Sequence, residues 1–227
     1  MVLAGKIFKV REKIDLDAVA AKLKNYREEE SYTEGDKEFR LVTEFRDLSL
    51  RRNVLEGLYA QDKIVHIRHH GELVPVPKTI EAQFAFTYER GLLLLTVLEK
   101  KWNANNIANR LSEIIFATTG YIVEARIPQE ALQRYHEGNP DGTKVIFFDE
   151  VDIPNVKKLS LYGPSLADTG LYSEYLKHGS IWYIVITSKR YGHIVGITRD
   201  GIVTIFNRLD PSGFFSYVAE EIYPLVE

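Results

Sequence analysis

The sequence of 227 residues predicts an α+β protein made of two related modules, each with the order strand, helix, several antiparallel strands, helix. Two observations predict this fold. A glycine opens an apolar, strand-like run at 91–97 and again at 201–207, and an amphipathic helix follows each run. The two closing helices, near 103–116 and 211–222, also carry apolar residues with the same four-residue spacing. These residues are Ile107, Leu111 and Ile115 in the first helix and Phe214, Val218 and Ile222 in the second. We therefore divide the chain into a first repeat, 1–118, and a second repeat, 119–227.

In the first module, residues 2–10 suit a strand, and Asp15 is placed to cap a helix over 16–27. The apolar period changes to two at Phe39, which begins a strand. Further strands are expected at 53–60, 63–68, 80–88 and 91–98, with hairpin turns at 70–72 and 89–91. Pro75 and Pro77 mark an edge strand or a connector. The first module is thus a set of short antiparallel strands between two helices.

In the second module, Pro128 opens a short helix after a strand at 120–127, and 138–142 is the strongest turn signal of the chain. Asp210 caps the last helix and Pro211 takes its first position. The remaining expected elements are strands at 144–148, 157–162, 181–188, 193–198 and 201–206 and a helical segment at 168–177. The element order of the first module is thus repeated.

The C-terminal region combines a glycine-led apolar strand beginning Gly201, Ile202 and Val203 with a helix that ends in Ile222, Tyr223 and Pro224. These features, with the repeated layout, resemble the TATA-box-binding protein family. The resemblance covers nearly the whole chain in layout but only the last few dozen residues in sequence. It implies a saddle-like curved antiparallel sheet with helices on one side.

The chain departs from that family at the residues that bend DNA. Family members that kink DNA insert paired phenylalanines from each repeat between base steps. Phe84 and Phe86 precede Gly91, but residues 192–200, which precede Gly201, contain no phenylalanine. The resemblance therefore implies the fold without recognition of a TATA box.

Composition narrows the class of protein. Hydrophobic residues make up 45% and charged residues 27% of the chain, as in ordinary globular proteins. No apolar run approaches the length of a membrane span, and the N-terminus lacks a secretory signal, so we expect a cytoplasmic protein without membrane contact. The absence of cysteine excludes disulfides and thiolate zinc sites. A single methionine and many charged residues are typical of thermophile proteins.

Basic residues near strand ends are the candidate nucleic-acid contacts, although 29 basic against 32 acidic residues argue against a strongly electrostatic binder. Trp102 follows two lysines and either stacks on a base or packs under the next helix. The candidate contacts are Arg51, Arg52, Lys63, Arg68, Lys100, Lys101, Trp102, Lys157, Lys158, Lys189 and Arg190. The leading hypothesis is a non-enzymatic binding protein that contacts DNA or RNA through its sheet face or this basic rim.

A homodimer is the first alternative. Leu92, Leu94 and Leu98 lie on one face of a strand, and Leu93, Leu95 and Val97 lie on the other. One face packs under helices, while the other is covered by protein, shielded in a dimer or used for binding. The alternative function is therefore a structural or interaction module that dimerises through its sheet.

A metal-dependent phosphodiesterase is the second alternative. Asp149, Glu150 and Asp152 form an acidic group that suits magnesium, and His66 shares a strand face with Arg68 and His70. No ligand spacing specifies a metal, and glycine-rich phosphate loops, dinucleotide fingerprints and nucleophile elbows are absent from the sequence. We accordingly assign no catalytic residue, metal or cofactor, and the sequence disfavours an enzyme.

Overall fold

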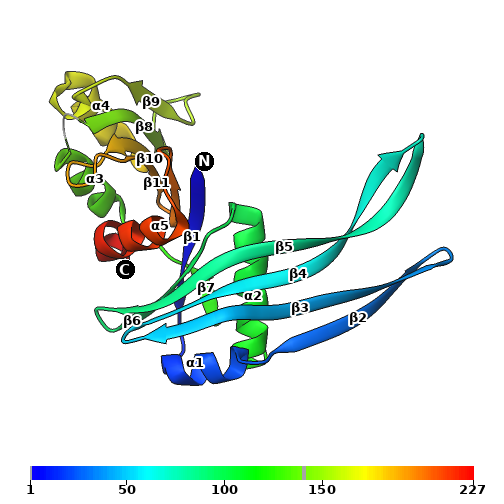
Figure 1. Ribbon diagram of the computed structural model, residues 1–227. Coiled ribbons are helices and arrows are strands. Elements are labelled where there is room, and N and C mark those ends of the chain that lie inside the picture. The colour runs from blue at the N-terminus through cyan, green and yellow to red at the C-terminus, as the bar shows by residue number, and fades with distance from the viewer. Residues whose placement is uncertain (1, 140–141) are drawn as a thin grey trace. The chain divides into compact units, whose positions relative to one another are not determined.

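The computed structural model describes residues 2–139 and 142–227 (Figure 1). Strands hold 46% and helices 27% of the chain, so the expected α+β class is confirmed. The strands that these residues form are antiparallel. None of the helices in the described ranges is long and apolar enough to cross a membrane.

Tertiary contacts divide the chain into two compact units that are interleaved in sequence. Unit 1 comprises Met1–Lys9, Leu98–Ala104 and Val123–Glu227, and unit 2 comprises Val10–Val97 and Asn105–Ile122. The division after residue 118 stays a prediction.

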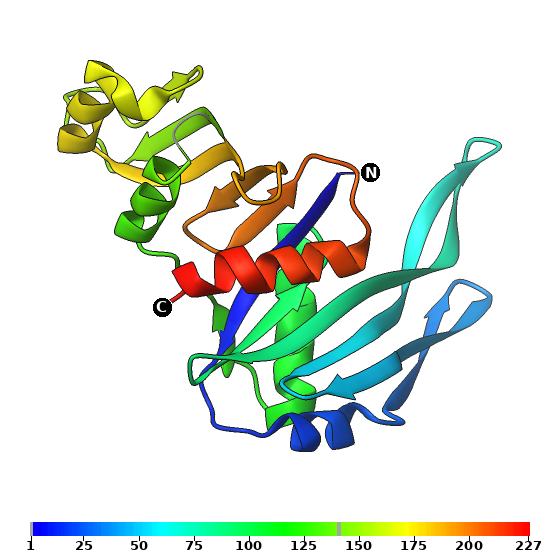
Figure 2. The same cartoon turned by 60° about the vertical axis from the view of Figure 1, so that its left-hand side comes forward.

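Unit 2 is an antiparallel sheet of long strands in the order β2-β3-β4-β5-β6 (Figure 2). Its strands are β2 (Arg27–Glu34), β3 (Lys37–Arg51), β4 (Val54–His69), β5 (Glu72–Glu89) and β6 (Leu92–Val97). Helix α1 (Leu16–Leu23) contacts β3 and β4, and α2 (Lys101–Phe116) contributes the rest of the unit's helical residues. Phe45 packs against Tyr59 and Phe84 at ring-centroid distances of 5.5 and 5.8 Å, and the three buried rings form an aromatic core on β3, β4 and β5.

The long β4–β5 hairpin differs from the expected short strands. The segments expected as separate strands at 53–60 and 63–68 are one strand, because β4 pairs with β5 without interruption from Val54 to His69. Pro75 and Pro77 lie inside β5, opposite His66 and Ile64. Because β6 pairs only with the last six residues of β5, both prolines lie at an open edge, where a missing N–H is tolerated. The edge interpretation is thus confirmed and the connector interpretation is wrong.

Unit 1 is a second antiparallel arrangement, in the order β1-β12-β11-β10-β8-β9, with β7 pairing β1. Its strands are β1 (Leu3–Val10), β7 (Ile122–Glu124), β8 (Thr143–Asp149), β9 (Leu159–Tyr162), β10 (Ser180–Thr187), β11 (Ile194–Thr198) and β12 (Ile202–Ile205). Its helices are α3 (Gln129–Glu137), α4 (Gly170–His178) and α5 (Pro211–Tyr217), with a π-helical turn (Val218–Ile222) and 3₁₀ turns at Leu166–Asp168 and Tyr223–Leu225. The expected turn at 138–142 includes residues 140 and 141, which lie outside the described residues.

Helix starts follow the sequence signals in part. The Asp210 carboxylate accepts a hydrogen bond of 2.7 Å from the amide of Gly213, and Pro211 is the first residue of α5, as expected. Asp15 takes the N-cap position of α1, as expected, but its side chain makes no capping hydrogen bond, so the expected carboxylate contact is wrong. In a different helix, α4, the Thr169 hydroxyl oxygen is the cap and accepts a hydrogen bond of 3.2 Å from the amide of Tyr172.

The prediction of two tandem strand-helix repeats is wrong. The two strand-then-helix endings exist, as β6 with α2 and β12 with α5, but the regions before them differ. The first holds one helix, α1, and the long strands β3, β4 and β5 of 15, 16 and 18 residues, whereas the second holds short strands and two helices, α3 and α4. A strand followed by a helix is a frequent pattern in α+β chains, and sharing it does not determine which elements precede it. Each unit's sheet is open, as a curved sheet would be, but the repeated layout behind the TATA-box-binding-protein-like fold is absent.

Both faces of β6 are covered within the chain. Five of its six residues, Leu93 to Val97, are buried, and Leu92 is half-buried. The second apolar face, which motivated a homodimer, is therefore not an exposed surface.

Candidate functional site

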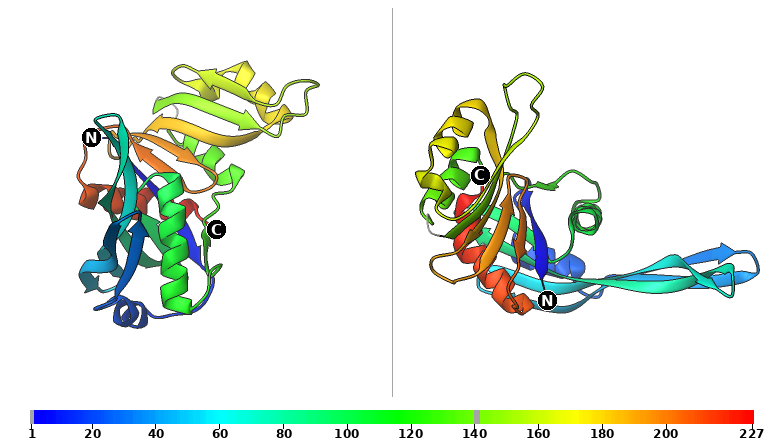
Figure 3. Two further views of the ribbon diagram at one scale, coloured as in Figure 1. Left: turned by 90° about the vertical axis from the view of Figure 1, so that its right-hand side faces the viewer. Right: turned by 90° about the horizontal axis from the view of Figure 1, so that it is seen from above.

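Strands β8, β9 and β10 lie side by side in unit 1 (Figure 3). Their outer face carries aromatic residues, which is unusual for a solvent-facing surface. Along β8 the buried residues Ile146 and Phe148 alternate with half-buried Val145 and Phe147, as a strand with one covered face requires. The covered face packs on α4, where the Phe148 ring lies 5.7 Å from that of Tyr175. The opposite face holds Phe147 and is open to solvent.

A β-bulge places two adjacent aromatic residues on this open face. The register of β10 against β8 shifts between Ile181, which pairs with Phe148, and Tyr183, which pairs with Phe147. Trp182 is the extra residue, and both it and Tyr183 are half-buried between the fully buried Ile181 and Ile184. A regular strand would turn one of the two rings into the core, whereas the bulge leaves both outside.

The four aromatic side chains form one cluster around Phe147. Its ring centroid lies 5.8 Å from that of Tyr162 on β9, 5.8 Å from Trp182 and 5.7 Å from Tyr183. Tyr162 is 67% exposed. We call Phe147, Tyr162, Trp182 and Tyr183 the aromatic face.

Gly196 on β11 makes room for this cluster. A Cβ atom at this position would lie 2.5 Å from the Tyr183 hydroxyl oxygen and 3.0 Å from the nearest carbon of the ring. The missing side chain therefore lets the Tyr183 ring lie across the neighbouring strand.

Cations border the aromatic face. The Lys158 ammonium lies 4.7 Å from the centre of the Trp182 ring, in cation–π geometry. Lys157 and Lys144 are exposed on the same segments, just before β9 and within β8. A ligand that presents flat rings and negative charge fits this combination.

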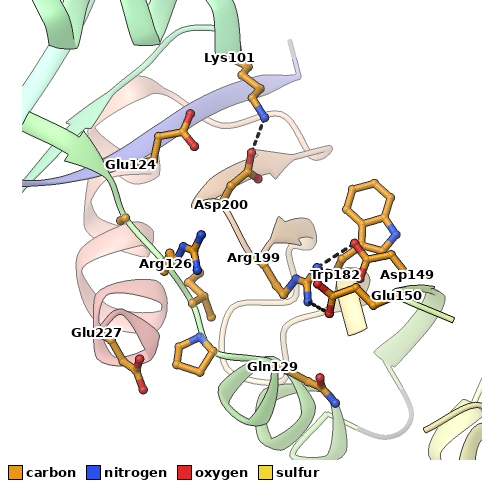
Figure 4. A pocket seen from close by; sticks show the side chains of 13 residues that line it. Lys101, Glu124, Arg126, Gln129, Asp149, Glu150, Trp182, Arg199, Asp200 and Glu227 are labelled. Atoms are coloured by element: carbon orange, nitrogen blue, oxygen red, sulfur yellow. Dashed lines mark hydrogen bonds and ion pairs between the residues drawn. The ribbon is translucent and has the colours of Figure 1, made fainter. Parts of the chain in front are cut away.

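A pocket of about 600 Å³ in unit 1 shares Trp182 with the aromatic face (Figure 4). Its lining mixes five carboxylates with three cations. The carboxylates are Glu124, Asp149, Glu150, Asp200 and Glu227, and the cations are Lys101, Arg126 and Arg199. The rest of the lining is Ala125, Ile127, Pro128, Gln129 and Trp182. Both signs of charge thus occur within one cavity.

Arg199 organises one side of the pocket. Its guanidinium donates to both oxygens of Asp149, at 2.7 and 2.8 Å, and reaches Glu150 at 3.3 Å. The hydrogen bond from Arg199, with a further one from Ser180, lowers the pKa of the Glu150 carboxyl. Glu150 is nevertheless 68% exposed, so most of its acceptor surface stays available.

Lys101 and Asp200 form a second ion pair in the pocket. Burial acts to raise the pKa of the Asp200 carboxyl, but hydrogen bonds from Lys101 and Thr198 outweigh it and hold this pKa below its usual value. The hydrogen bond to Asp200 likewise raises the pKa of Lys101. Both groups are therefore charged at neutral pH and engaged with each other.

Arg126 and Gln129 line the pocket without a partner. Neither side chain makes a hydrogen bond or ion pair with any residue in the described ranges. Arg126 lies on the segment that leads into α3, and Gln129 is the first residue of that helix. Figure 4 shows Arg126 and Arg199 on opposite sides of the space. Their donors are free for a ligand.

The predicted contact residues are distributed over both units. Lys101 lines the pocket and Lys158 covers Trp182, so these two lie at the features described above. Trp102, in the first turn of α2, is 65% exposed, which makes its interpretation as a core residue wrong. Lys100 precedes α2 and Lys157 precedes β9.

Other predicted contacts lie elsewhere. Arg51 and Arg52 are at the turn between β3 and β4, and Lys63 and Arg68 are on β4, all in unit 2. Lys189 and Arg190 follow β10, where the Arg190 guanidinium contacts Glu220 at 2.7 Å and stacks on Tyr191. The eleven predicted residues thus do not form one cluster.

The predicted metal groups are engaged in other contacts. His66 lies 2.9 Å from Glu34, and His70 lies in the turn after β4 instead of on its face. Asp152 pairs with His178 at 2.8 Å. Across residues 2–139 and 142–227, no three His, Asp or Glu side chains converge as a metal site would require.

Sequence reasoning missed the aromatic face. The strands that carry it were expected at nearly these positions, but the side chains were assigned no role. The available signal was the adjacent pair Trp182 and Tyr183 inside a strand, because two consecutive bulky rings cannot both enter one core face.

Comparison with protein-family models finds no match, and neither does comparison with curated proteins.

Proposed function

We propose that the protein is a non-enzymatic nucleic-acid-binding protein that takes up a single strand of DNA or RNA on the aromatic face. The observation that carries the proposal is the bulged strand β10, which holds Trp182 and Tyr183 beside Phe147 on an open sheet face. The contact is thus made by the sheet face, with lysines at its border.

Stacking supplies the affinity in this proposal. Every nucleobase has a flat π-face, so exposed aromatic rings bind bases with little regard to sequence, at about 1–3 kcal/mol per base. Tyr162 and Phe147, with rings 5.8 Å apart, offer such surfaces on neighbouring strands. Lys157 and Lys158 are placed to contact phosphates along the same strand of nucleic acid.

Single strands fit this face better than duplexes. In a duplex the bases are stacked on each other, and side chains on a flat sheet reach only the backbone and the groove edges. The overall charge of −3 also disfavours a purely electrostatic duplex contact. We therefore expect aromatic stacking to supply most of the binding free energy, and added salt to weaken the binding only in part.

The alternatives remain predictions with less support. A homodimer through β6 has no exposed face there, because both faces of that strand are buried. A phosphodiesterase needs a metal site, whereas Asp149 is paired with Arg199 and no three His, Asp or Glu side chains converge among the described residues.

Fluorescence anisotropy with labelled oligo(dC), oligo(rC) and a hairpin duplex tests the proposal. We expect both single strands to bind more tightly than the duplex. Tyr162→Ala should weaken single-strand binding by about tenfold, because one stacking partner is lost. The control is Tyr32→Ala, which removes a partly exposed tyrosine from β2 in unit 2. Absence of binding, or equal loss in both variants, would remove the proposal.

A further inference from the structure

We infer that the pocket beside the aromatic face holds one nucleotide of the bound strand and prefers a base with an exocyclic amino group. This inference rests on the proposed function and adds a base preference to it. It follows from the position, size and unused polar groups of the pocket (Figure 4).

Position connects the two sites. Trp182 belongs both to the aromatic face and to the pocket lining. A strand stacked along Tyr162 and Phe147 therefore passes the pocket when it reaches Trp182. A base that leaves the stack at that point has a cavity to enter.

The pocket has the size of a small-molecule site. Its volume of about 600 Å³ lies inside the range of roughly 300–1,000 Å³ typical for such ligands. One nucleotide, with its base, sugar and phosphate, is a ligand within this range.

The charges of the lining favour a base over an isolated phosphate. Five carboxylates against three cations repel a free anion, and Lys101 and Arg199 are already neutralised by Asp200 and Asp149. Carboxylates instead accept hydrogen bonds from amino groups, as Asp and Glu do with the N4 amino group of cytosine. The pocket is thus suited to a ligand that donates hydrogen bonds.

Glu150 is the carboxylate best placed to read the base. Its contact with Arg199, at 3.3 Å, is longer than those of Asp149, and its side chain is mostly exposed. It can accept from a base amino group without losing the Arg199 contact. Where cytosine carries its N4 amino group, uracil and thymine carry the carbonyl oxygen O4, which the carboxylate would repel.

Arg126 supplies the contact for the phosphate of the same nucleotide. Its guanidinium has no partner among residues 2–139 and 142–227, and a guanidinium binds phosphate oxygens in bidentate geometry. This contact is independent of the base, so it raises the affinity for every nucleotide and does not change which base is preferred.

Two oligomers that differ at the base edge test the inference. Anisotropy with labelled oligo(dC) and oligo(dU) compares an amino group with a carbonyl oxygen on pyrimidines of the same size. We expect oligo(dC) to bind about tenfold more tightly, as for a hydrogen bond to a charged group. Glu150→Ala should reduce this ratio to about twofold or less, since the acceptor is removed. Glu130→Ala is the matched control, an exposed glutamate on α3 outside the pocket.

The outcomes separate the two proposals. Equal binding of both oligomers, or an unchanged preference in Glu150→Ala, overturns the pocket inference and leaves the aromatic face intact. Absence of binding to the wild-type chain overturns both.

Arg126→Ala tests the phosphate contact. It should weaken the binding of both oligomers equally and reduce the slope of log affinity against log salt concentration by about one. Circular dichroism of each variant establishes that the exposed substitutions leave the fold unchanged, and Glu150→Gln serves as a second, isosteric test.

Discussion

At the scale of single residues, the missing side chain of Gly196 shapes the aromatic face. Gly196→Ala would bring a Cβ within 2.5 Å of the Tyr183 hydroxyl oxygen, so the ring has to move. We expect a loss of about 1–3 kcal/mol in the free energy of unfolding, as for overpacking elsewhere. Urea denaturation measures this loss.

Gly170→Ala is the control for that substitution. Gly170 begins α4, and no heavy atom lies within 4 Å of a Cβ placed there. Alanine also favours helix over glycine, so stability should stay equal or rise slightly. If Gly196→Ala were as stable as this control, the close approach of Tyr183 would not restrict the site.

His178 at the end of α4 is a second residue with a measurable effect. Hydrogen bonds to Asp152 and Glu174 raise the pKa of its imidazole above 6.5. A raised pKa in the folded state stabilises the fold at pH values below 6.5, and this contribution disappears as the pH rises through the folded pKa.

NMR titration of the His178 ring checks this expectation. The midpoint should lie above 6.5 and should fall in Asp152→Asn, because that variant replaces the carboxylate with the largest effect on this pKa by a neutral amide. His178→Gln should reduce stability at acidic pH and leave it unchanged at alkaline pH. A midpoint at or below 6.5 in the wild type would contradict the expected contacts.

At the scale of elements, the prolines of β5 protect an open strand edge. Residues 72–83 of β5 pair with β4 but not with β6, so their outer backbone groups lack a strand partner. Such edges promote association with other chains, and proline on the edge prevents it. The double variant Pro75→Val, Pro77→Val should therefore associate at increasing protein concentration.

Light scattering over a concentration series measures this association. Pro154→Val is the control, because Pro154 lies in the exposed connection between β8 and β9 and belongs to no strand. A double variant that stays as dispersed as this control would show that the edge is protected in another way.

The sequence predicted most elements but not their extent or the site. Strand and helix periods located β6, α2, β12 and α5, since these depend on local pattern. The length of β4 was missed, because cross-strand pairing with β5 continues through polar residues such as Asp62 that weaken the local signal. For the aromatic face, the adjacent pair Trp182 and Tyr183 indicates only that one ring stays outside the core. That both rings do so depends on the bulge against the neighbouring strand β8, which is not a local feature of the sequence.

At the scale of the whole molecule, each unit is assembled from segments that lie far apart in the sequence. Leu3 to Lys6 of β1 pair with β12, although about two hundred residues separate them in sequence. Val203 and Ile205 of β12 are fully buried. Any fragment that lacks β1 leaves one side of β12 without a strand partner.

We therefore expect fragment 119–227 to unfold at a lower temperature than the full chain, or without a cooperative transition. Thermal unfolding followed by circular dichroism makes the comparison. Addition of a peptide with residues 2–10 should raise the transition temperature, because it replaces β1. A fragment as stable as the full chain would instead support the division of the chain after residue 118.

The extra residue in β10 separates the chemistry of the open face from the hydrophobic core. Without Trp182, Ile181 would still lie opposite Phe148 and Tyr183 opposite Phe147, as they do now. Ile184 and Ile186 would therefore keep their places in the core, and only the open face would lose a ring. The bulge thus adds an aromatic side chain to the surface without changing which residues of the strand face the interior.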